Sequence, residues 1–292
     1  MNQRDIEKVN CAVCGSKESK IACLKDGFNI VKCSNCGLYY VNPRLKPKRL
    51  SELYNEDEIS PIDYYIETKK ADEKTFRKRL KAIERTLGRK GRILDIGCNI
   101  GTLLFLAKDL GWECFGLDIN KKVRKYFSGS GIDLKISDVL EAKYPKNHFD
   151  AIVMNDLIEH VPDPKRVLLK VHEWLKDDGE IFLVTPDGGS LMFSLLGKRW
   201  FHLKPNEHIY YFTRNSLHKL LSDAGFEIVF MKHLGRRRSL KTLAAKSVSV
   251  TGGLSSVILK VFRWMRLTSL DIPFNLYDEY GVIAKKKRQI LD

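Results

Sequence analysis

Two aspartates near the ends of short apolar segments stand out first in this 292-residue chain. Asp95 lies in RILDIGCNIG, and Asp118 ends ECFGLD. Gly97 and Gly101 flank a tight turn after the first segment, where backbone N–H groups can approach a ligand at the start of a helix. A carboxylate at the end of the next strand suits the two hydroxyls of a ribose. The spacing therefore predicts a nucleoside-binding edge of a sheet.

The position of Asp95 limits which nucleoside-containing ligands the predicted site can bind. A dinucleotide-binding turn has the pattern G-x-G-x-x-G, whereas the turn here is Gly-Cys-Asn-Ile-Gly and directly follows the segment with Asp95. A carboxylate in that place repels a pyrophosphate but attracts a cationic ammonium or sulfonium group. A nucleoside with a positively charged amino-acid tail fits both aspartates. S-adenosylmethionine is such a molecule, and we predict it as the cofactor.

Four cysteines near the N-terminus form two Cys-x-x-Cys pairs: Cys11 with Cys14, and Cys33 with Cys36. This spacing fits a structural zinc site, in which four thiolates close a tetrahedral shell and leave no position for a substrate water. A glycine follows each pair and permits a tight turn around a thiolate. Two redox-active dithiols are the alternative. The other cysteines are interpreted as buried packing residues: Cys23, Cys98 and Cys114.

Candidates for catalysis lie in two further segments. MNDLIEHVPDP places Glu159 and His160 just past an apolar strand, where a histidine could accept the proton of a hydroxyl acceptor. GKRWFHLKPNEHIYYFT places His208 among aromatic residues, a combination that makes a dry and specific pocket. Each histidine has an alternative interpretation as a packing residue, and the sequence does not rank one above the other.

An alternation of apolar strands and amphipathic helices after residue 92 supplies the scaffold for these residues. Such alternation predicts an α/β fold with a doubly wound, mostly parallel, seven-stranded sheet that helices cover on both faces. We expect strands at residues 92–97, 113–119, 133–139, 149–156, 179–187, 227–235 and 277–287, and helices at 102–111, 121–131, 164–179 and 213–226.

Four motifs in this order resemble those of class I S-adenosylmethionine-dependent methyltransferases: LDIGCNIG, GLDI, ISDV and FDAIVMNDLIEHVPDP. The resemblance covers about residues 91–230 and implies a Rossmann-like methyltransferase fold. Asn99 departs from the pattern, because the family more often has glycine there. The cofactor-binding residues that the resemblance implies are Asp95, Gly97, Asn99 and Gly101 for the methionine moiety, Asp118 for the ribose, Asp138 and Val139 for the adenine, together with Ile119 and Asn155.

Two other segments resemble parts of more specialised methyltransferases. CSNCGLYYVNPR, followed by Tyr54, Tyr64 and Tyr65, is similar to a zinc-binding segment on some bacterial and archaeal methyltransferases of sugar or cell-envelope pathways. There the segment is interpreted as a lid on the substrate side. NEHIYYFT resembles a segment common among small-molecule methyltransferases, which favours a functional role for His208.

The motifs divide the chain into three predicted regions. Residues 1–45 are expected to form a zinc-ribbon-like segment and residues 46–88 a helical connector or lid. Residues 89–292 are expected to form the class I methyltransferase domain, with a helical insertion at about 236–276. The connector has a polar stretch, LYNEDEISPIDYYIETKKADEK, before a helix, TFRKRLKAIERTL, that carries four apolar residues on one face: Phe76, Leu80, Ile83 and Leu87.

The composition indicates which cellular location and which binding partners to expect for this protein. Lys and Arg number 51 against 36 Asp and Glu, a net charge of +15 that favours an anionic partner such as nucleic acid, a phosphorylated substrate or a membrane surface. A basic helix around 255–268 could contact lipid or phosphates, although a solvated helix on the core is the alternative. The chain lacks a membrane-spanning run or a signal-like start, and the cysteine usage suits a reducing compartment, so we expect a cytoplasmic protein.

Three functions are consistent with these features. The leading one is an O-directed methyltransferase for a small molecule or saccharide, such as an anionic, nucleotide-linked or lipid-linked sugar of cell-envelope or polysaccharide biosynthesis, with C-methyl transfer left open. The second is an RNA methyltransferase that grips phosphates with the zinc segment and basic surface. MNDL differs from the Asn/Asp-Pro-Pro-aromatic motif of many base methyltransferases. The third is a non-catalytic, zinc-bearing binding protein, against which the intact cofactor motif argues. The oligomeric state is not predicted.

Overall fold

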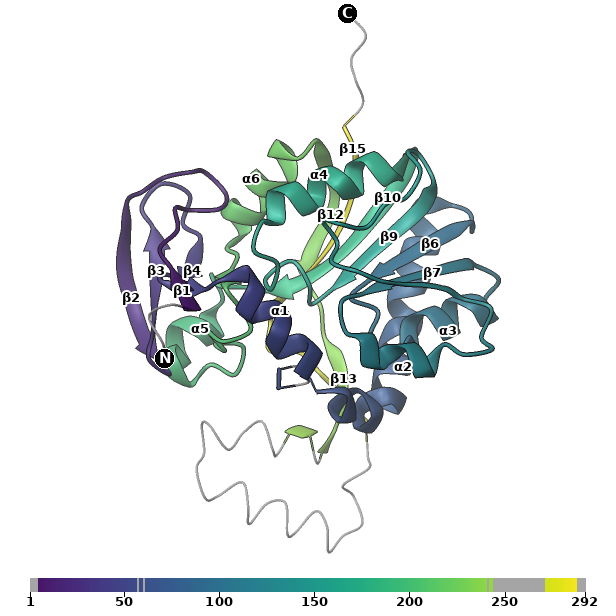
Figure 1. Ribbon diagram of the computed structural model, residues 1–292, viewed down its shortest axis with the longest axis horizontal. Helices are drawn as coiled ribbons and strands as arrows, with labels where there is room; N and C mark the ends of the chain where they lie inside the picture. The colour runs from purple at the N-terminus through teal and green to yellow at the C-terminus, as the bar shows by residue number, and fades with distance from the viewer. Residues whose placement is uncertain (1–4, 57, 60, 241, 244–270, 288–292) are drawn as a thin grey trace, which may run out of the picture.

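A seven-stranded sheet forms the centre of the computed structural model, which describes residues 5–56, 58–59, 61–240, 242–243 and 271–287 (Figure 1). The strand order is β12-β15-β10-β9-β6-β7-β8. The strands from β10 to β8 are parallel, and β15 lies antiparallel between β10 and β12. The strands are β6 Arg92–Ile96, β7 Glu113–Asp118, β8 Asp133–Ile136, β9 Phe149–Asn155, β10 Leu175–Pro186, β12 Phe226–His233 and β15 Glu279–Lys286. The predicted fold class is confirmed.

Helices cover both faces of this sheet. Alternate residues of the central strands point to opposite sides, as the pleat of a strand requires. Ile93 and Val153 belong to a buried cluster with the helices on one face, whereas Leu94 and Ile152 belong to a cluster with those on the other. One face carries α2 Ile62–Leu87 and α3 Thr102–Asp109, and the other carries α4 Pro164–Trp174 and α6 Arg214–Asp223 (Figure 1).

Three helix predictions differ from the structure. The helix expected at 164–179 ends at Trp174, because Leu175 is fully buried and pairs with Phe149 of the sheet. The helix expected at 121–131 is a short 3-10 helix, η2 Lys121–Tyr126, and two glycines with positive φ follow it. The polar stretch before residue 75 is largely helical, because α2 begins at Ile62 and α1 spans Pro47–Glu56. Most residues of this stretch are polar, so the apolar spacing that indicates a helix is weak there.

The N-terminal region builds a second, four-stranded sheet with the order β11-β4-β3-β2. Its strand β11 comes from the connection after β10, so residues far apart in the sequence share this sheet. A two-stranded sheet of β1 and β5 lies beside it, and α1 leads back to the main sheet (Figure 1). The elements are β1 Ile6–Glu7, β2 Ser19–Lys25, β3 Phe28–Cys33, β4 Tyr39–Val41, β5 Arg44–Leu45, α5 Leu191–Leu196, η3 Gly197–Arg199 and β11 Tyr210–Tyr211.

The two ends of the predicted insertion pair with each other. Strands β13 Arg236–Ser239 and β14 Asp271–Phe274 form an antiparallel pair, and the Arg237 backbone N–H donates to Thr75 Oγ1 of α2 over 3.0 Å. The basic helix predicted around 255–268 lies outside the described residues. No helix in the described part of the chain is both long and apolar enough to span a lipid bilayer.

Replacing Leu80 by alanine tests whether α2 belongs to the core. Leu80 is 0% exposed, so Leu80→Ala is expected to lower the free energy of unfolding by about 2–5 kcal/mol through lost contacts and a cavity. Ile66 on the same helix is 47% exposed, and Ile66→Ala is expected to lower it by no more than about 1 kcal/mol. Urea denaturation of both variants gives the two values. Equally small losses would contradict the packing of α2 on the sheet.

Candidate functional site

Two adjoining cavities lie beyond the carboxyl ends of β6, β7 and β9, where open parallel sheets bind ligands. Their volumes are about 160 Å³ and about 330 Å³. The walls that they share include Tyr65, Gly97, Asn99, Asp156 and His160. The smaller cavity is also lined by Asp118, Ile119, Asp138 and Val139, and the larger by Asp95, Asn155, Glu207 and His208. Most of the site residues predicted from the sequence therefore meet here.

The turn after β6 has the backbone geometry that its glycines suggest. Gly97 and Gly101 have φ values of +77°, and Asn99 has +47°, a left-handed conformation that asparagine tolerates better than most residues. The Asn99 side-chain oxygen accepts a hydrogen bond from the Ile100 N–H over 2.7 Å. Gly101 begins α3, and a Cβ there would meet the Phe127 ring at 2.7 Å. Gly101 is not among the described residues that line the two cavities, so its visible role is close packing.

Asp118 holds the turn and faces the smaller cavity. Its Oδ2 accepts from the Asn99 N–H and its Oδ1 from the Asn120 N–H, both over 2.8 Å. Each carboxylate oxygen keeps a further lone pair that could accept from a ligand hydroxyl. Burial raises the pKa of Asp118, and the two backbone hydrogen bonds oppose this shift. The side chain thus has both a structural role and a free face toward the cavity. Asp138, exposed on the same cavity, accepts from the Leu140 N–H over 2.7 Å.

A buried arginine that the sequence analysis missed lies behind the larger cavity. Arg79 of α2 is 4% exposed, and its Nη1 donates to Asn155 Oδ1 over 2.7 Å. Its Nε and Nη2 have no hydrogen-bond partner in the described part of the chain. Burial and the Asp118 charge raise the pKa of Asp95, and Arg79 lowers it. The sequence did contain a signal for this buried arginine. Arg79 lies three residues after Phe76 and four before Ile83, which places its positive charge on the apolar face of the helix.

The catalytic candidates form a compact cluster at the wall of the larger cavity. His160 Nε2 lies 4.0 Å from Glu159 Oε1, and the ring centroids of His160 and His208 are 4.6 Å apart. His160 Nδ1 lies 2.7 Å from Tyr54 Oη of α1 and 3.0 Å from the carbonyl oxygen of Glu207. Glu159 lies beneath the two histidines, fully buried, and its Oε2 accepts from Thr185 Oγ1 over 3.0 Å.

Burial determines the protonation of this cluster. It raises the pKa of Glu159 well above its ordinary value, and the nearby Asp156 charge adds to this shift. Burial also lowers the pKa of His160, and it lowers that of His208 well below its ordinary value with His160 as the next cause. Both imidazoles are therefore neutral near pH 7 and have a nitrogen lone pair to offer to a proton or a metal ion.

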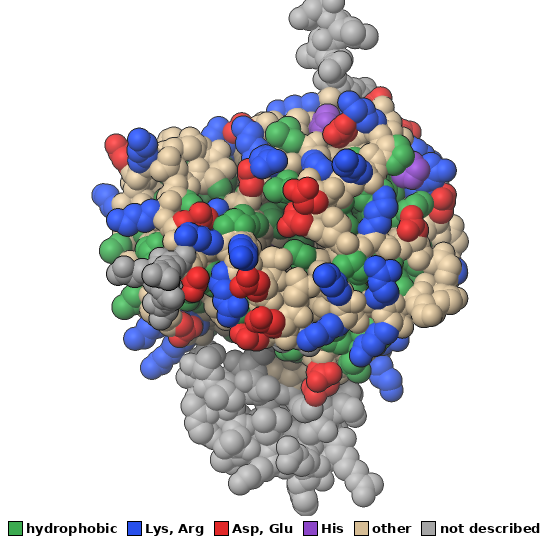
Figure 2. All heavy atoms as spheres, in the orientation of Figure 1, with side chains coloured by type: hydrophobic (Ala, Val, Ile, Leu, Met, Phe, Trp, Pro, Cys, Tyr) green, Lys and Arg blue, Asp and Glu red, His purple; other side chains and the backbone are tan. Residues whose placement is uncertain are grey.

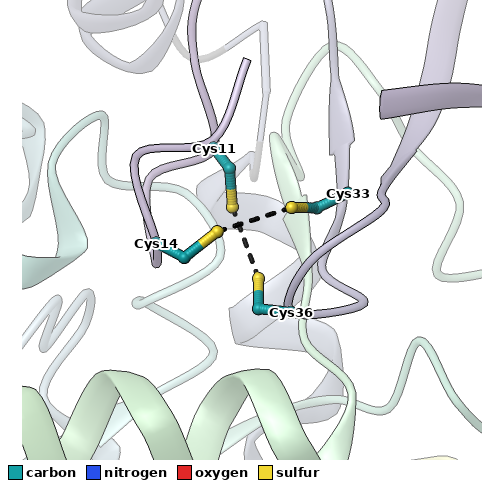
Figure 3. A group of neighbouring side chains, drawn as sticks. All are labelled: Cys11, Cys14, Cys33 and Cys36. Atoms are coloured by element: carbon teal, nitrogen blue, oxygen red, sulfur yellow. Dashed lines mark hydrogen bonds between the residues drawn. The ribbon is translucent and has the colours of Figure 1, made fainter. Parts of the chain in front are cut away.

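The four paired cysteines converge on one point in the N-terminal sheet (Figure 3). The Sγ atoms of Cys11 and Cys36 are 3.4 Å apart, and those of Cys14 and Cys33 are 3.5 Å apart. A tetrahedral zinc ion with Zn–S bonds of about 2.3 Å separates its sulfurs by about 3.8 Å. The residues present therefore fit a structural zinc ion. Of the unpaired cysteines, Cys98 and Cys114 are buried and Cys23 is half-buried.

A family model described as a methyltransferase domain matches residues 68–230 of this chain. The ubiquinone biosynthesis O-methyltransferase of Nitrosospira multiformis is 27% identical over 165 residues, which cover 51% of this chain and 69% of that protein. The enzyme of the same name from Pseudomonas aeruginosa is 27% identical over 42% of this chain and 57% of its own length. The (S)-coclaurine N-methyltransferase of Papaver somniferum is 28% identical over 31% of this chain and 28% of that protein.

Solved structures share the fold at lower identity. A SAM-dependent methyltransferase from Archaeoglobus fulgidus aligns with a TM-score of 0.52 and 24% identity, over 76% of this chain and 99% of that one. The 1,6-didemethyltoxoflavin-N1-methyltransferase of Burkholderia thailandensis aligns with a TM-score of 0.57 and 15% identity, over 93% of this chain and 100% of that one. At these identities the similarity establishes the fold alone.

Removing one paired cysteine tests the zinc centre. Cys14→Ser is expected to lower the zinc content by about one ion per chain and to reduce the melting temperature, because the closed shell loses a thiolate. Cys23→Ser is the matched control, since Cys23 lies on β2 of the same sheet outside the cluster, and it should keep the ion. Elemental analysis and thermal melts measure both. Unchanged zinc in Cys14→Ser would rule out a four-thiolate site.

Proposed function

Because this chain belongs to the methyltransferase domain family and is an S-adenosylmethionine-dependent methyltransferase, we propose that it methylates a hydroxyl of a small-molecule or saccharide acceptor. The observation that carries the proposal is the pair of cavities that meet at Gly97 and His160. The smaller one suits the nucleoside of the cofactor, and the larger one suits its methionine moiety with an acceptor beside it. An anionic sugar, linked to a nucleotide or a lipid, is the acceptor class that the net charge of +15 favours.

The cofactor site follows from the residues around the turn. We propose that Asp138 and Val139 hold the adenine, that Asp118 accepts from the ribose hydroxyls, and that Asp95 attracts the ammonium group. The unpartnered Nε and Nη2 of Arg79 supply donors for the carboxylate of the methionine moiety. Asn155 orients this guanidinium through its own hydrogen bond. The cofactor supplies an electrophilic methyl group on a sulfonium.

The acceptor site follows from the cluster of Glu159, His160 and His208. The acceptor oxygen loses its proton and forms a bond to the methyl carbon, while the carbon–sulfur bond breaks and its electrons stay on sulfur. We propose that this cluster activates the oxygen, because His160 and His208 line the larger cavity with neutral imidazoles. Tyr54 and Tyr65 line the cofactor side, where α1 and the start of α2 shield the reacting atoms from water.

Three observations support a small acceptor over RNA. The larger cavity, about 330 Å³, is of the size that small molecules occupy. On the face that Figure 2 shows, Lys and Arg side chains are interspersed with Asp and Glu and do not gather into one basic stripe. Relatives named for ubiquinone biosynthesis and for (S)-coclaurine are named for small molecules. Membership of an enzyme family also supports catalysis over the alternative of a zinc-bearing binding protein.

Asp118→Ala tests the cofactor site. The variant is expected to bind S-adenosylmethionine at least about tenfold more weakly, because a hydrogen bond to a charged group contributes about 1.5–3 kcal/mol. Asp133→Ala on β8 is the control, since Asp133 is exposed and absent from the described cavity walls, and its affinity should not change. Isothermal titration calorimetry gives both constants. Equal affinities for wild type and Asp118→Ala would refute the assignment.

Arg79→Met tests the proposed carboxylate contact. Removing the guanidinium is expected to weaken S-adenosylmethionine and S-adenosylhomocysteine by about tenfold or more, because the carboxylate loses charge-assisted donors. Decarboxylated S-adenosylmethionine lacks that carboxylate, so it should bind wild type and variant with similar affinity. Arg85→Met, an exposed position on the same helix, controls for the lost charge. A loss of the same size for the decarboxylated analogue would show that Arg79 acts only on the fold.

Methyl transfer tests the acceptor class. Purified protein with S-adenosylmethionine labelled in the methyl group is offered nucleotide sugars, lipid-linked sugars, phenols and RNA in parallel. Label in a sugar or phenol that base treatment does not release is expected for an O-methyl ether. Label in RNA, with none in the small molecules, would overturn the proposal in favour of the RNA methyltransferase.

A further inference from the structure

The hydrogen bonds of His160 determine which of its nitrogens bears the proton. Nδ1 lies 3.0 Å from the carbonyl oxygen of Glu207, and a carbonyl can only accept. Nδ1 must therefore carry the hydrogen, with the Tyr54 hydroxyl, 2.7 Å away, as a second neighbour. This assignment follows from the network, as histidine tautomers generally do. Nε2 is left with a lone pair, and it faces Glu159.

Two further buried atoms of the cluster of Glu159, His160 and His208 have no hydrogen-bond partner of their own among the described residues. Glu159 Oε1 and His208 Nδ1 make no hydrogen bond in the described part of the chain, although both residues are at least nine-tenths buried. Glu159 Oε1 lies 4.0 Å from His160 Nε2, which is too far for a shared proton. One ligand atom from each of the three residues lies within 4.8 Å of the other two.

A cation accounts for this arrangement. Ligand bonds of about 2.0–2.2 Å allow one metal ion to bridge atoms that are 4.0 Å apart, where a proton does not. The ion would satisfy the lone pair of His160, the free oxygen of Glu159 and the ring of His208 together. When a histidine binds a metal ion through one ring nitrogen, the N–H of its other ring nitrogen usually donates a hydrogen bond to a carbonyl or carboxylate. The Nδ1–H of His160 donates to the Glu207 carbonyl in this way.

We propose that Glu159, His160 and His208 bind a divalent metal ion at the wall of the larger cavity. Two imidazoles and one carboxylate favour ions such as Mn²⁺, Fe²⁺, Co²⁺ or Zn²⁺ and leave positions open for an oxygen ligand. His160 and His208 line the cavity whereas Glu159 lies beneath, so the open positions face the acceptor. This site is separate from the four thiolates, which select zinc.

The ion gives the proposed O-methylation a source of acceptor activation, and in this respect the inference rests on the proposed function. A hydroxyl oxygen bound to a divalent ion has a lowered pKa, so its proton leaves to solvent water. With the ion bound, the deprotonated acceptor oxygen would form its bond to the methyl carbon as the carbon–sulfur bond of the sulfonium breaks and its electrons stay on sulfur. The histidines act as ligands in this scheme and need not accept the proton.

Binding of Mn²⁺ tests the site without any methyl transfer. Mn²⁺ prefers nitrogen and oxygen ligands to thiolates, so the zinc-loaded protein can be titrated with Mn²⁺ and the free ion followed by electron paramagnetic resonance. We expect one Mn²⁺ per chain, with at least a tenfold loss of affinity in both Glu159→Gln and His208→Asn. Glu159→Gln keeps the shape of the side chain and its contact with Thr185. His218→Asn, an exposed position on α6, should bind as wild type does.

The S-adenosylmethionine affinity of the same samples distinguishes a failure of the metal site from misfolding and from a failure of the proposed function. Variants that still bind the cofactor are folded, so their loss of Mn²⁺ reports the site itself. Wild-type protein that binds the cofactor but takes up no Mn²⁺, Co²⁺ or second Zn²⁺ would overturn the metal site and leave the proposed methyl transfer intact. Mn²⁺ binding that neither variant weakens would also overturn it. Failure to bind the cofactor would instead count against the proposed function.

Discussion

The pairing of β11 with β4 is the interaction on which the walls of the larger cavity depend. Only two residues of each strand take part, but they join the N-terminal sheet to the connection after β10. Arg44, next to this sheet, donates to Tyr210 Oη over 2.5 Å and to the Pro162 carbonyl over 2.9 Å. The N–H groups of Ile209 and Tyr210 donate to the carbonyl of Glu159. The four cysteines thus lie in the region of a sheet whose edge strand, β11, follows directly on the backbone contacts to Glu159.

The smaller cavity depends on a different constraint, the register of parallel strands. Because β6 and β7 end at the same edge, the Asp118 carboxylate reaches the turn after β6 and accepts from its backbone. This one contact shapes the turn and presents a carboxylate to the cavity. The two halves of the site meet at His160, which belongs to the segment after β9 and contacts Tyr54 of α1. The two cavities are therefore joined through backbone geometry as well as through shared side chains.

Much of the fold and the turn after β6 could be predicted from the sequence, because these features depend on local spacing. The glycine turn, each strand-end aspartate and each Cys-x-x-Cys pair can be recognised from a few neighbouring residues. Arg79 was not predicted, since a charged residue in an amphipathic helix usually faces water. The Tyr54–His160 contact joins residues 106 positions apart, and β11 is too short to show a strand period. Such long-range contacts leave no local pattern.

The place of β15 in the sheet affects how the protein is made. This strand follows β10 and β12 in the chain, and it pairs with both of them. Until it emerges from the ribosome, β10 presents an unpaired edge and β12 has no partner in the sheet. Exposed strand edges pair readily with other chains. Completion of the sheet must therefore follow synthesis of residues 279–286, and a nascent or shortened chain is the form most exposed to aggregation.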